Sequence, residues 1–153
     1  MSAKRGATTR ALSDTDFQRL AQFRYALRQF LHFSEEAARG AGLNPQQYQA
    51  LVVVRGFDGG RAPTVGELAK RLLIEHHSAV GLVDRLESAG LFMREKGSSD
   101  GRRVSLVLTD RAQNLLSDLV VAHRSELRRL MPLMKPLFNQ LNPSKPAKSR
   151  AGK

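Results

Sequence analysis

The chain has 153 residues, no cysteine and a formal net charge of +11. This length suits one domain with one sizeable core. The lack of cysteine excludes a thiol redox switch, a disulfide framework and a cysteine-ligated zinc site. No apolar run approaches the length of a membrane span and no signal-peptide core opens the chain, so we expect a cytoplasmic protein without a membrane partner.

The positive charge is concentrated at the two ends of the chain. Residues 1–12 and 142–153 hold seven of the 25 lysines and arginines and no acid, which leaves 18 bases against 14 acids on residues 13–141. We therefore predict a modestly basic domain over 13–141 between two basic, disordered arms. Extra phosphate contacts are the alternative role for these arms.

A long first helix is predicted over about 14–38. Ser13 supplies a capping oxygen, and Asp14 and Asp16 place acids at the positive end of the helix dipole. Its apolar residues cover more than one narrow stripe, which favours a helix that buries one face in a subunit interface. An ordinary central core helix is the alternative. These apolar residues are Phe17, Leu20, Ala21, Phe23, Leu27, Phe30 and Leu31.

Two capping boxes predict the next two helices. Asn44, Pro45 and Gln47 start a helix that runs to about Arg55, and Thr64 with Glu67 starts another that reaches Leu72. We expect the inward residues of the first to be Tyr48, Leu51, Val52 and Val54, and the apolar residues of the second are Leu68, Ala69 and Leu72.

The fourth helix, from about His76 to Ala89, has a distinct inside and outside. Gly90 supplies the left-handed residue that ends it, and Leu91 can reach back to Leu86. Helical projection places Ala79, Leu82, Val83 and Leu86 on the inner face. The outer face carries His77, Gly81, Asp84 and Ser88, flanked by Val80 on one side and by Ser78 and Arg85 on the other.

A hairpin and a last helix complete the chain. Strands at 91–95 and 104–108, the second with residues 104, 106 and 108 inward, flank a loop with an Asp100-Gly101 turn. Thr109 then caps a helix to about Leu141, which we expect to be kinked or broken at Pro132 and Pro136. Its apolar residues are Leu115, Leu116, Leu119, Leu127 and Leu130. The fold class is therefore mainly α with a small β-hairpin wing, a winged helix-turn-helix over about 45–109.

This order of elements suits double-stranded DNA. The N-terminal end of the fourth helix, with His76, His77 and Ser78, can enter the major groove, where Gly81 allows a close approach. Arg102 and Arg103 lie beside a glycine turn, from which a guanidinium can extend into a narrow minor groove. Because base-reading side chains are few, we expect DNA shape and the minor groove to carry much of the discrimination. A hairpin with solvated arginines is the alternative for the loop taken alone.

Three runs resemble the MarR family of bacterial transcription regulators. They are TVGELAKRL at 64–72, VDRLESAGL at 83–91 and DGRRVSLVLT at 100–109. The resemblance covers roughly residues 14–135 and implies a homodimer joined through its terminal helices, about 14–38 and 110–141. It implies binding to pseudo-palindromic operators, repression of neighbouring genes, and release by a small aromatic or lipophilic ligand. It also places Asp100 and Arg102 in the wing motif, with Arg102 in the minor groove, whereas Gly81 replaces the usual base-reading arginine.

The predicted sites follow from these arguments. We expect an effector pocket near Phe23, Tyr25, Phe30, His32 and Phe33, although aromatics at this spacing also suit a plain core. Asp100 either pairs with a neighbouring arginine or only forms the turn. The predicted DNA-contacting residues are Thr64, His76, His77, Ser78, Val80, Gly81, Arg85, Lys96, Asp100, Arg102 and Arg103.

Other chemistries are disfavoured. Residues 97–101 match the G-x-S-x-G pattern of a hydrolase elbow, but that motif needs a strand-to-helix turn on a large sheet, so we expect no enzyme. Adjacent His76 and His77 diverge by about 100° on a helix, so we expect no metal and no cofactor. His123 suits a satisfied core or interface position, with a pH-sensitive or ligand-facing role as the alternative. Two other functions stay open, a winged-helix module that binds protein and a non-specific architectural DNA binder.

Overall fold

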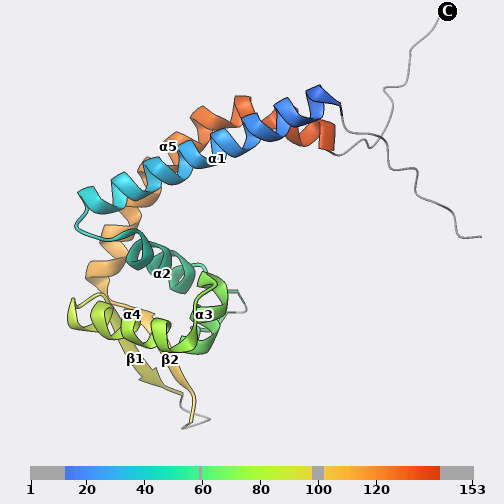
Figure 1. Ribbon diagram of the computed structural model, residues 1–153. Helices are drawn as coiled ribbons and strands as arrows, with labels where there is room; N and C mark the ends of the chain where they lie inside the picture. The colour runs from blue at the N-terminus through green and yellow to red at the C-terminus, as the bar shows by residue number, and fades with distance from the viewer. Residues whose placement is uncertain (1–12, 59, 98–101, 142–153) are drawn as a thin grey trace, which may run out of the picture. The chain divides into compact units, whose positions relative to one another are not determined.

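The structure is a computed structural model that describes residues 13–58, 60–97 and 102–141 (Figure 1). It confirms a mainly helical chain with one antiparallel hairpin as its sheet within the described residues. The predicted basic arms, 1–12 and 142–153, lie outside those residues. In chain order the elements are α1 (Asp14–Gly40), α2 (Pro45–Arg55), α3 (Val65–Leu72), α4 (His76–Ser88), β1 (Phe92–Lys96), β2 (Val104–Leu108) and α5 (Asp110–Leu141).

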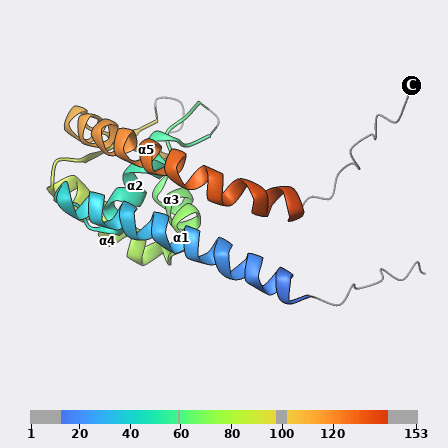
Figure 2. The same ribbon diagram turned by 90° about the horizontal axis from the view of Figure 1, so that it is seen from above.

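The chain divides into two compact units. One unit is Met1–Leu31 with Leu127–Lys153, and the other is His32–Glu126. Both described segments of the first unit are helical, the start of α1 and the end of α5 (Figure 2). The second unit holds α2, α3, α4 and the hairpin, together with the adjoining parts of α1 and α5.

Local capping explains where the helices begin. The Ser13 hydroxyl accepts a hydrogen bond from the Asp16 amide at 3.3 Å, and the Asp16 carboxylate accepts one from the Ser13 amide at 2.9 Å. Reciprocal bonds of the same kind join Asn44 to Gln47 and Thr64 to Glu67. The predicted capping boxes are therefore confirmed, because each depends only on residues three positions apart.

The core of the His32–Glu126 unit is built around α4. Its inner face is fully buried, as predicted, and contacts α3 and β1. At its end Gly90 takes a left-handed φ of 70°, and the Leu91 amide donates to the Leu86 carbonyl at 2.9 Å. Large, fully buried side chains of this core are Leu82 and Leu86 on α4 and, from other elements, Leu51, Leu68, Phe92 and Leu106.

The hairpin is fixed to this core at its base. Phe92 pairs with Leu108 and Lys96 with Val104, so the strands run antiparallel without a register slip. The Leu106 amide donates to the carbonyl of buried Pro63 at 2.7 Å, which attaches the segment before α3 to the outer edge of β2. This bond ties the wing to the helix-turn-helix.

Four sequence predictions need correction. Val52 is exposed rather than inward, because Ala50 takes the buried place on α2. Strand β1 begins at Phe92 and buries that residue alone, and Val104 is only half-buried, because the hairpin extends beyond the core. Helix α5 continues through Pro132 and Pro136 to Leu141, so the predicted break is wrong, whereas the alternative, a kink, stays a prediction. Each proline removes one backbone hydrogen bond, and at exposed Pro132 water can satisfy the freed carbonyl.

Large apolar side chains are exposed on both long helices. On α1 the exposed fractions of Phe17, Leu20 and Leu31 are 57%, 54% and 43%. On α5 they reach 71% for Val121 and 61% for Met131. A single subunit therefore leaves exposed much of the apolar surface of α1, the helix that we predict to bury one face in a subunit interface.

Candidate nucleic-acid interface

The outer face of α4 is open along its length. His76, His77 and Ser78 are all exposed in the first turn, and Val80 and Gly81 are half-buried in the next. The N-cap residue, Glu75, makes no side-chain hydrogen bond to the helix. The first amides of α4 thus receive no side-chain acceptor from their cap, and a helix start of this kind favours an anion such as a DNA phosphate.

The turn before α4 is strained at one residue. Leu73 ends α3 with φ 55° and ψ 42°, the left-handed region, and its side chain is 92% exposed. A leucine in this region costs roughly 1–2 kcal/mol relative to a right-handed conformation. The turn holds because the next amide, that of Ile74, donates to the Ala69 carbonyl at 3.1 Å.

Arg94 on β1 forms ion pairs with both acids of α4. Its guanidinium donates to Asp84 at 2.6 Å and also to Glu87. Hydrogen bonding to Asp84 is the main cause that raises the pKa of Arg94 above its ordinary value. The single guanidinium offsets one of the two negative charges of α4, and it couples the helix to the wing.

The wing residues lie around the tip of the hairpin. Lys96 ends β1 and is exposed, and Arg102 is exposed in the turn that leads into β2. Asp100, the other predicted wing residue, lies outside the described residues, so its pairing stays a prediction. The described part of the wing thus presents two cations at its tip.

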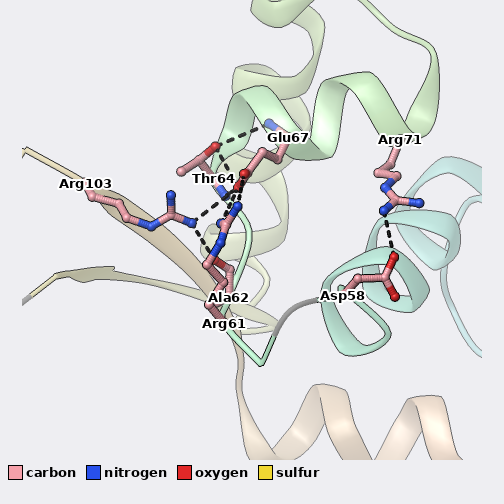
Figure 3. Close-up of polar contacts among 7 residues, drawn as sticks. All are labelled: Asp58, Arg61, Ala62, Thr64, Glu67, Arg71 and Arg103. Carbon is pink, nitrogen blue, oxygen red and sulfur yellow. Dashed lines mark hydrogen bonds and ion pairs between the residues drawn. The ribbon is translucent and has the colours of Figure 1, made fainter.

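Glu67 is the centre of a polar cluster that joins α3, the preceding loop and the wing (Figure 3). Arg61 donates to both of its carboxylate oxygens, at 3.0 and 2.5 Å, and Arg103 donates to one at 3.3 Å. The same oxygen of Glu67 accepts from the Thr64 amide at 2.9 Å. The Arg61 hydrogen bond, followed by the Thr64 amide, holds the pKa of Glu67 far below its ordinary value.

Two of the predicted DNA-contacting residues, Thr64 and Arg103, belong to this cluster. The Thr64 hydroxyl accepts from the Glu67 amide, and Arg103 donates to the Ala62 carbonyl at 2.9 Å as well as to Glu67. Arg103, which directly precedes β2 at the tip side of the hairpin, therefore anchors the wing to the loop before α3, whereas Arg102 is exposed one residue earlier. Their contacts with DNA stay predictions.

Sequence reasoning missed three residues of this region, namely Arg61, Glu67 in its ion-pairing role, and Arg94. Glu67 was recognisable as a capping residue, but its arginine partners lie 6 and 36 positions away. Arg94 lies 10 positions from Asp84, and only the alternation of the strand could have placed it near α4. A similar pair, Arg71 with Asp58 at 2.9 Å, lies at the C-terminal end of α3 (Figure 3).

The predicted effector residues differ in exposure. Tyr25 is 61% exposed, His32 is exposed, and Phe23, Phe30 and Phe33 are half-buried. A cavity of about 310 Å³ lies elsewhere, between the end of α2 and strand β2, and includes none of these five residues. The effector pocket therefore stays a prediction. The residues that line the cavity include Val54, Arg55, Phe57, Leu106 and Leu108.

His123 is a satisfied core histidine, as predicted. Its two ring nitrogens lie 2.6 Å from the Leu119 carbonyl and 2.7 Å from the Ser34 hydroxyl. Its ring stacks on Tyr48 at a centroid distance of 4.8 Å and meets Phe33 edge to face. This cluster joins α1, α2 and α5 inside the His32–Glu126 unit.

The part of the chain that the structure describes holds neither a metal-binding cluster of side chains nor a membrane-spanning helix. Residues 13–58, 60–97 and 102–141 hold no group of three or more histidines and acids arranged to hold a metal ion. Within the same ranges, no helix combines the length and the apolarity that crossing a bilayer requires.

The fold and this interface are those of a winged helix-turn-helix protein, and known proteins resemble the chain in sequence and in structure. Residues 41–103 match the MarR family. The chain is 36% identical over 87 residues to YcgE, an uncharacterized HTH-type transcriptional regulator of Bacillus subtilis, a match covering 57% of this chain and 54% of YcgE. It is 29% identical over 101 residues to the HTH-type transcriptional repressor YetL of the same organism, covering 65% of this chain and 59% of YetL.

A solved structure supports the fold assignment. A mutant of MepR from S. aureus, bound to an oligodeoxyribonucleotide, superposes with a TM-score of 0.63 at 17% identity, covering 80% of this chain and 94% of that chain. The chain spans little more than half the length of the two curated relatives above. The match over residues 41–103 confirms the predicted resemblance to the MarR family. The relatives are transcriptional regulators, not enzymes.

Proposed function

We propose that this protein is a homodimeric transcriptional regulator that binds double-stranded DNA at a pseudo-palindromic operator. The observation that carries the proposal is the open outer face of α4, with its uncapped start, beside a wing that presents Lys96 and Arg102. A helix of this kind fits the major groove, and arginine at a wing tip fits the adjacent minor groove. The oligonucleotide-bound MepR structure, which has the same fold, supports this reading.

Dimer formation is proposed from the exposed apolar surface of the terminal helices. Phe17, Leu20 and Leu31 on α1 and Val121 and Met131 on α5 are each between 43% and 71% exposed in the single subunit. An apolar surface of this extent marks a protein interface more often than a solvated face. A twofold pair would also present two copies of α4 to the two halves of a palindromic site.

Repression, with relief by a small aromatic or lipophilic ligand, is the direction of control that we propose. Support comes from the sequence resemblance and from the repressor YetL among the relatives. The effector would bind near Phe23, Tyr25, Phe30 and His32, which form the aromatic-rich part of α1.

The direct test measures binding of the purified chain to the DNA upstream of its own gene by fluorescence anisotropy. We expect tight binding to that duplex, weak binding to an unrelated duplex, and a steep loss of affinity with salt because phosphate contacts release counterions. Size-exclusion chromatography with light scattering should give twice the 17.0 kDa chain mass.

The same measurements separate the two alternative functions. Equal affinity for both duplexes, lost when residues 1–12 and 142–153 are removed, would identify a non-specific architectural binder. No binding to either duplex at low salt would leave the protein-binding module as the function. A mass of 17.0 kDa at working concentration would contradict the dimer.

A further inference from the structure

Arg85 stands apart from the other charged residues of α4. It is the one lysine or arginine of the helix, and it is exposed. The acids closest to it in sequence on α4, Asp84 and Glu87, are both engaged by Arg94. Among the residues that the structure describes, no carboxylate lies within ion-pair distance of Arg85, so its five donors are available to a ligand.

The side chain of Arg85 is directed toward the start of the helix and covers Gly81. A Cβ built on Gly81 would lie 3.4 Å from Nη1 of Arg85, so the guanidinium lies in van der Waals range of the position that a Cβ would take. This placement follows from helix geometry, because a long side chain leans over the turn that precedes its own Cα. The guanidinium is therefore one turn closer to the N-terminal end than the Arg85 backbone.

Position 81 lies on the outer face of α4, in the half of the helix that follows His77 and Ser78. A side chain longer than a methyl group at this position would compete with the guanidinium for the same surface of the helix. Gly81 and Arg85 thus act together, since the glycine leaves the space and the arginine supplies the planar, charged donor. In the first two turns of the helix, the other exposed side chains are short or are histidines.

We infer that Arg85 reads a guanine in the major groove of each half-site from above Gly81, and is a specificity-determining residue of the regulator. A guanidinium can donate two parallel hydrogen bonds to O6 and N7 of guanine, a pair of acceptors that no other base presents in that groove. A lone uncompensated arginine on the outer face of a groove-binding helix suits this contact better than an ion pair would. The inference rests on the proposed function, and its test is designed to fail separately from it.

The test selects duplexes from a random library with the full-length wild-type protein and with Arg85→Ala, Arg85→Lys and the surface control Arg55→Ala. We expect one position of the wild-type half-site to require guanine, and that requirement to disappear in Arg85→Ala while the other positions keep theirs. Replacing that G·C pair by A·T should weaken wild-type binding about 5- to 150-fold, the discrimination of one bidentate contact. The same replacement should weaken Arg85→Ala less than twofold.

Two controls keep the outcome interpretable. Arg85→Lys should retain a reduced preference, because an ammonium contacts the same acceptors without bidentate geometry. Arg55→Ala, which removes an exposed arginine on α2, should leave every base preference unchanged. Both positions are exposed, and circular dichroism with thermal melting establishes that each variant is folded.

Two results would overturn the inference while leaving the proposed function intact. One is a uniform loss of affinity across all duplexes with every base preference kept, which would place Arg85 on a phosphate. The other is unchanged binding by Arg85→Ala. A wild-type protein that selects no sequence at all would instead overturn the proposed function, and this inference with it.

Discussion

Replacing Glu67 by glutamine tests the polar cluster that links the wing to α3. The amide keeps an oxygen that can accept from the Thr64 amide, so the capping box survives, whereas the negative charge facing Arg61 and Arg103 is lost. Because the side chains of these ion pairs are 27% to 49% exposed, each pair is worth about 0.2–1 kcal/mol. We therefore expect Glu67→Gln to lower the free energy of unfolding by about 1 kcal/mol at neutral pH.

The pH dependence of stability provides the sharper assay. The pKa of Glu67 is lowered in the folded state, mainly by the Arg61 hydrogen bond, so its contribution is complete above the ordinary carboxyl pKa of about 4.3. That contribution is lost as the pH falls below this value toward the folded-state pKa. Urea unfolding from pH 7 to pH 3 should therefore show a difference between wild type and Glu67→Gln that is constant well above the ordinary carboxyl pKa and shrinks in part as the pH falls below it.

A matched variant separates charge from capping. Glu67→Ala removes the reciprocal cap as well as the ion pairs, so it should cost about 1 kcal/mol more than Glu67→Gln, and that extra cost should persist at low pH. A difference between wild type and Glu67→Gln that stays constant from pH 7 to pH 3 would refute the reasoning, because an uncharged contact would then hold the cluster.

The remaining predictions concern the turn, the wing, the core and the dimer. Leu73→Gly should raise the free energy of unfolding by about 0.5–1 kcal/mol, whereas Leu73→Ala, which keeps the left-handed penalty, should not; equal melting temperatures would contradict the strain. Arg102→Ala should cost about 1–3 kcal/mol of operator affinity in anisotropy titrations, and unchanged binding would remove the wing from recognition. His123→Ala should destabilise by about 2 kcal/mol or more in urea, because the Ser34 hydrogen bond and Tyr48 stacking are lost. Leu20→Lys should halve the mass measured by light scattering if α1 forms the dimer interface.

Prediction from sequence succeeded where the interaction is local. The capping boxes, the inner face of α4 and the left-handed Gly90 each depend on residues within one or two helical turns, so spacing alone identifies them. It failed where neighbouring elements decide burial. Val52 has the apolar character of an inward residue, yet α2 turns that side to solvent, and the exposed length of the hairpin determines how little of β1 is buried.

The amino-acid sequence alone determined the order of helices and strands, the family resemblance, and the exposed first turn of α4 with its two histidines. Only the tertiary structure decided that Arg103 anchors the wing, that Arg94 occupies the acids of α4, and that Arg85 covers Gly81. The physical reason is the range of the forces involved. Periodicity and capping are properties of a short segment, whereas an ion pair between residues 10 or 36 positions apart exists only after the core has brought its strand and helix together.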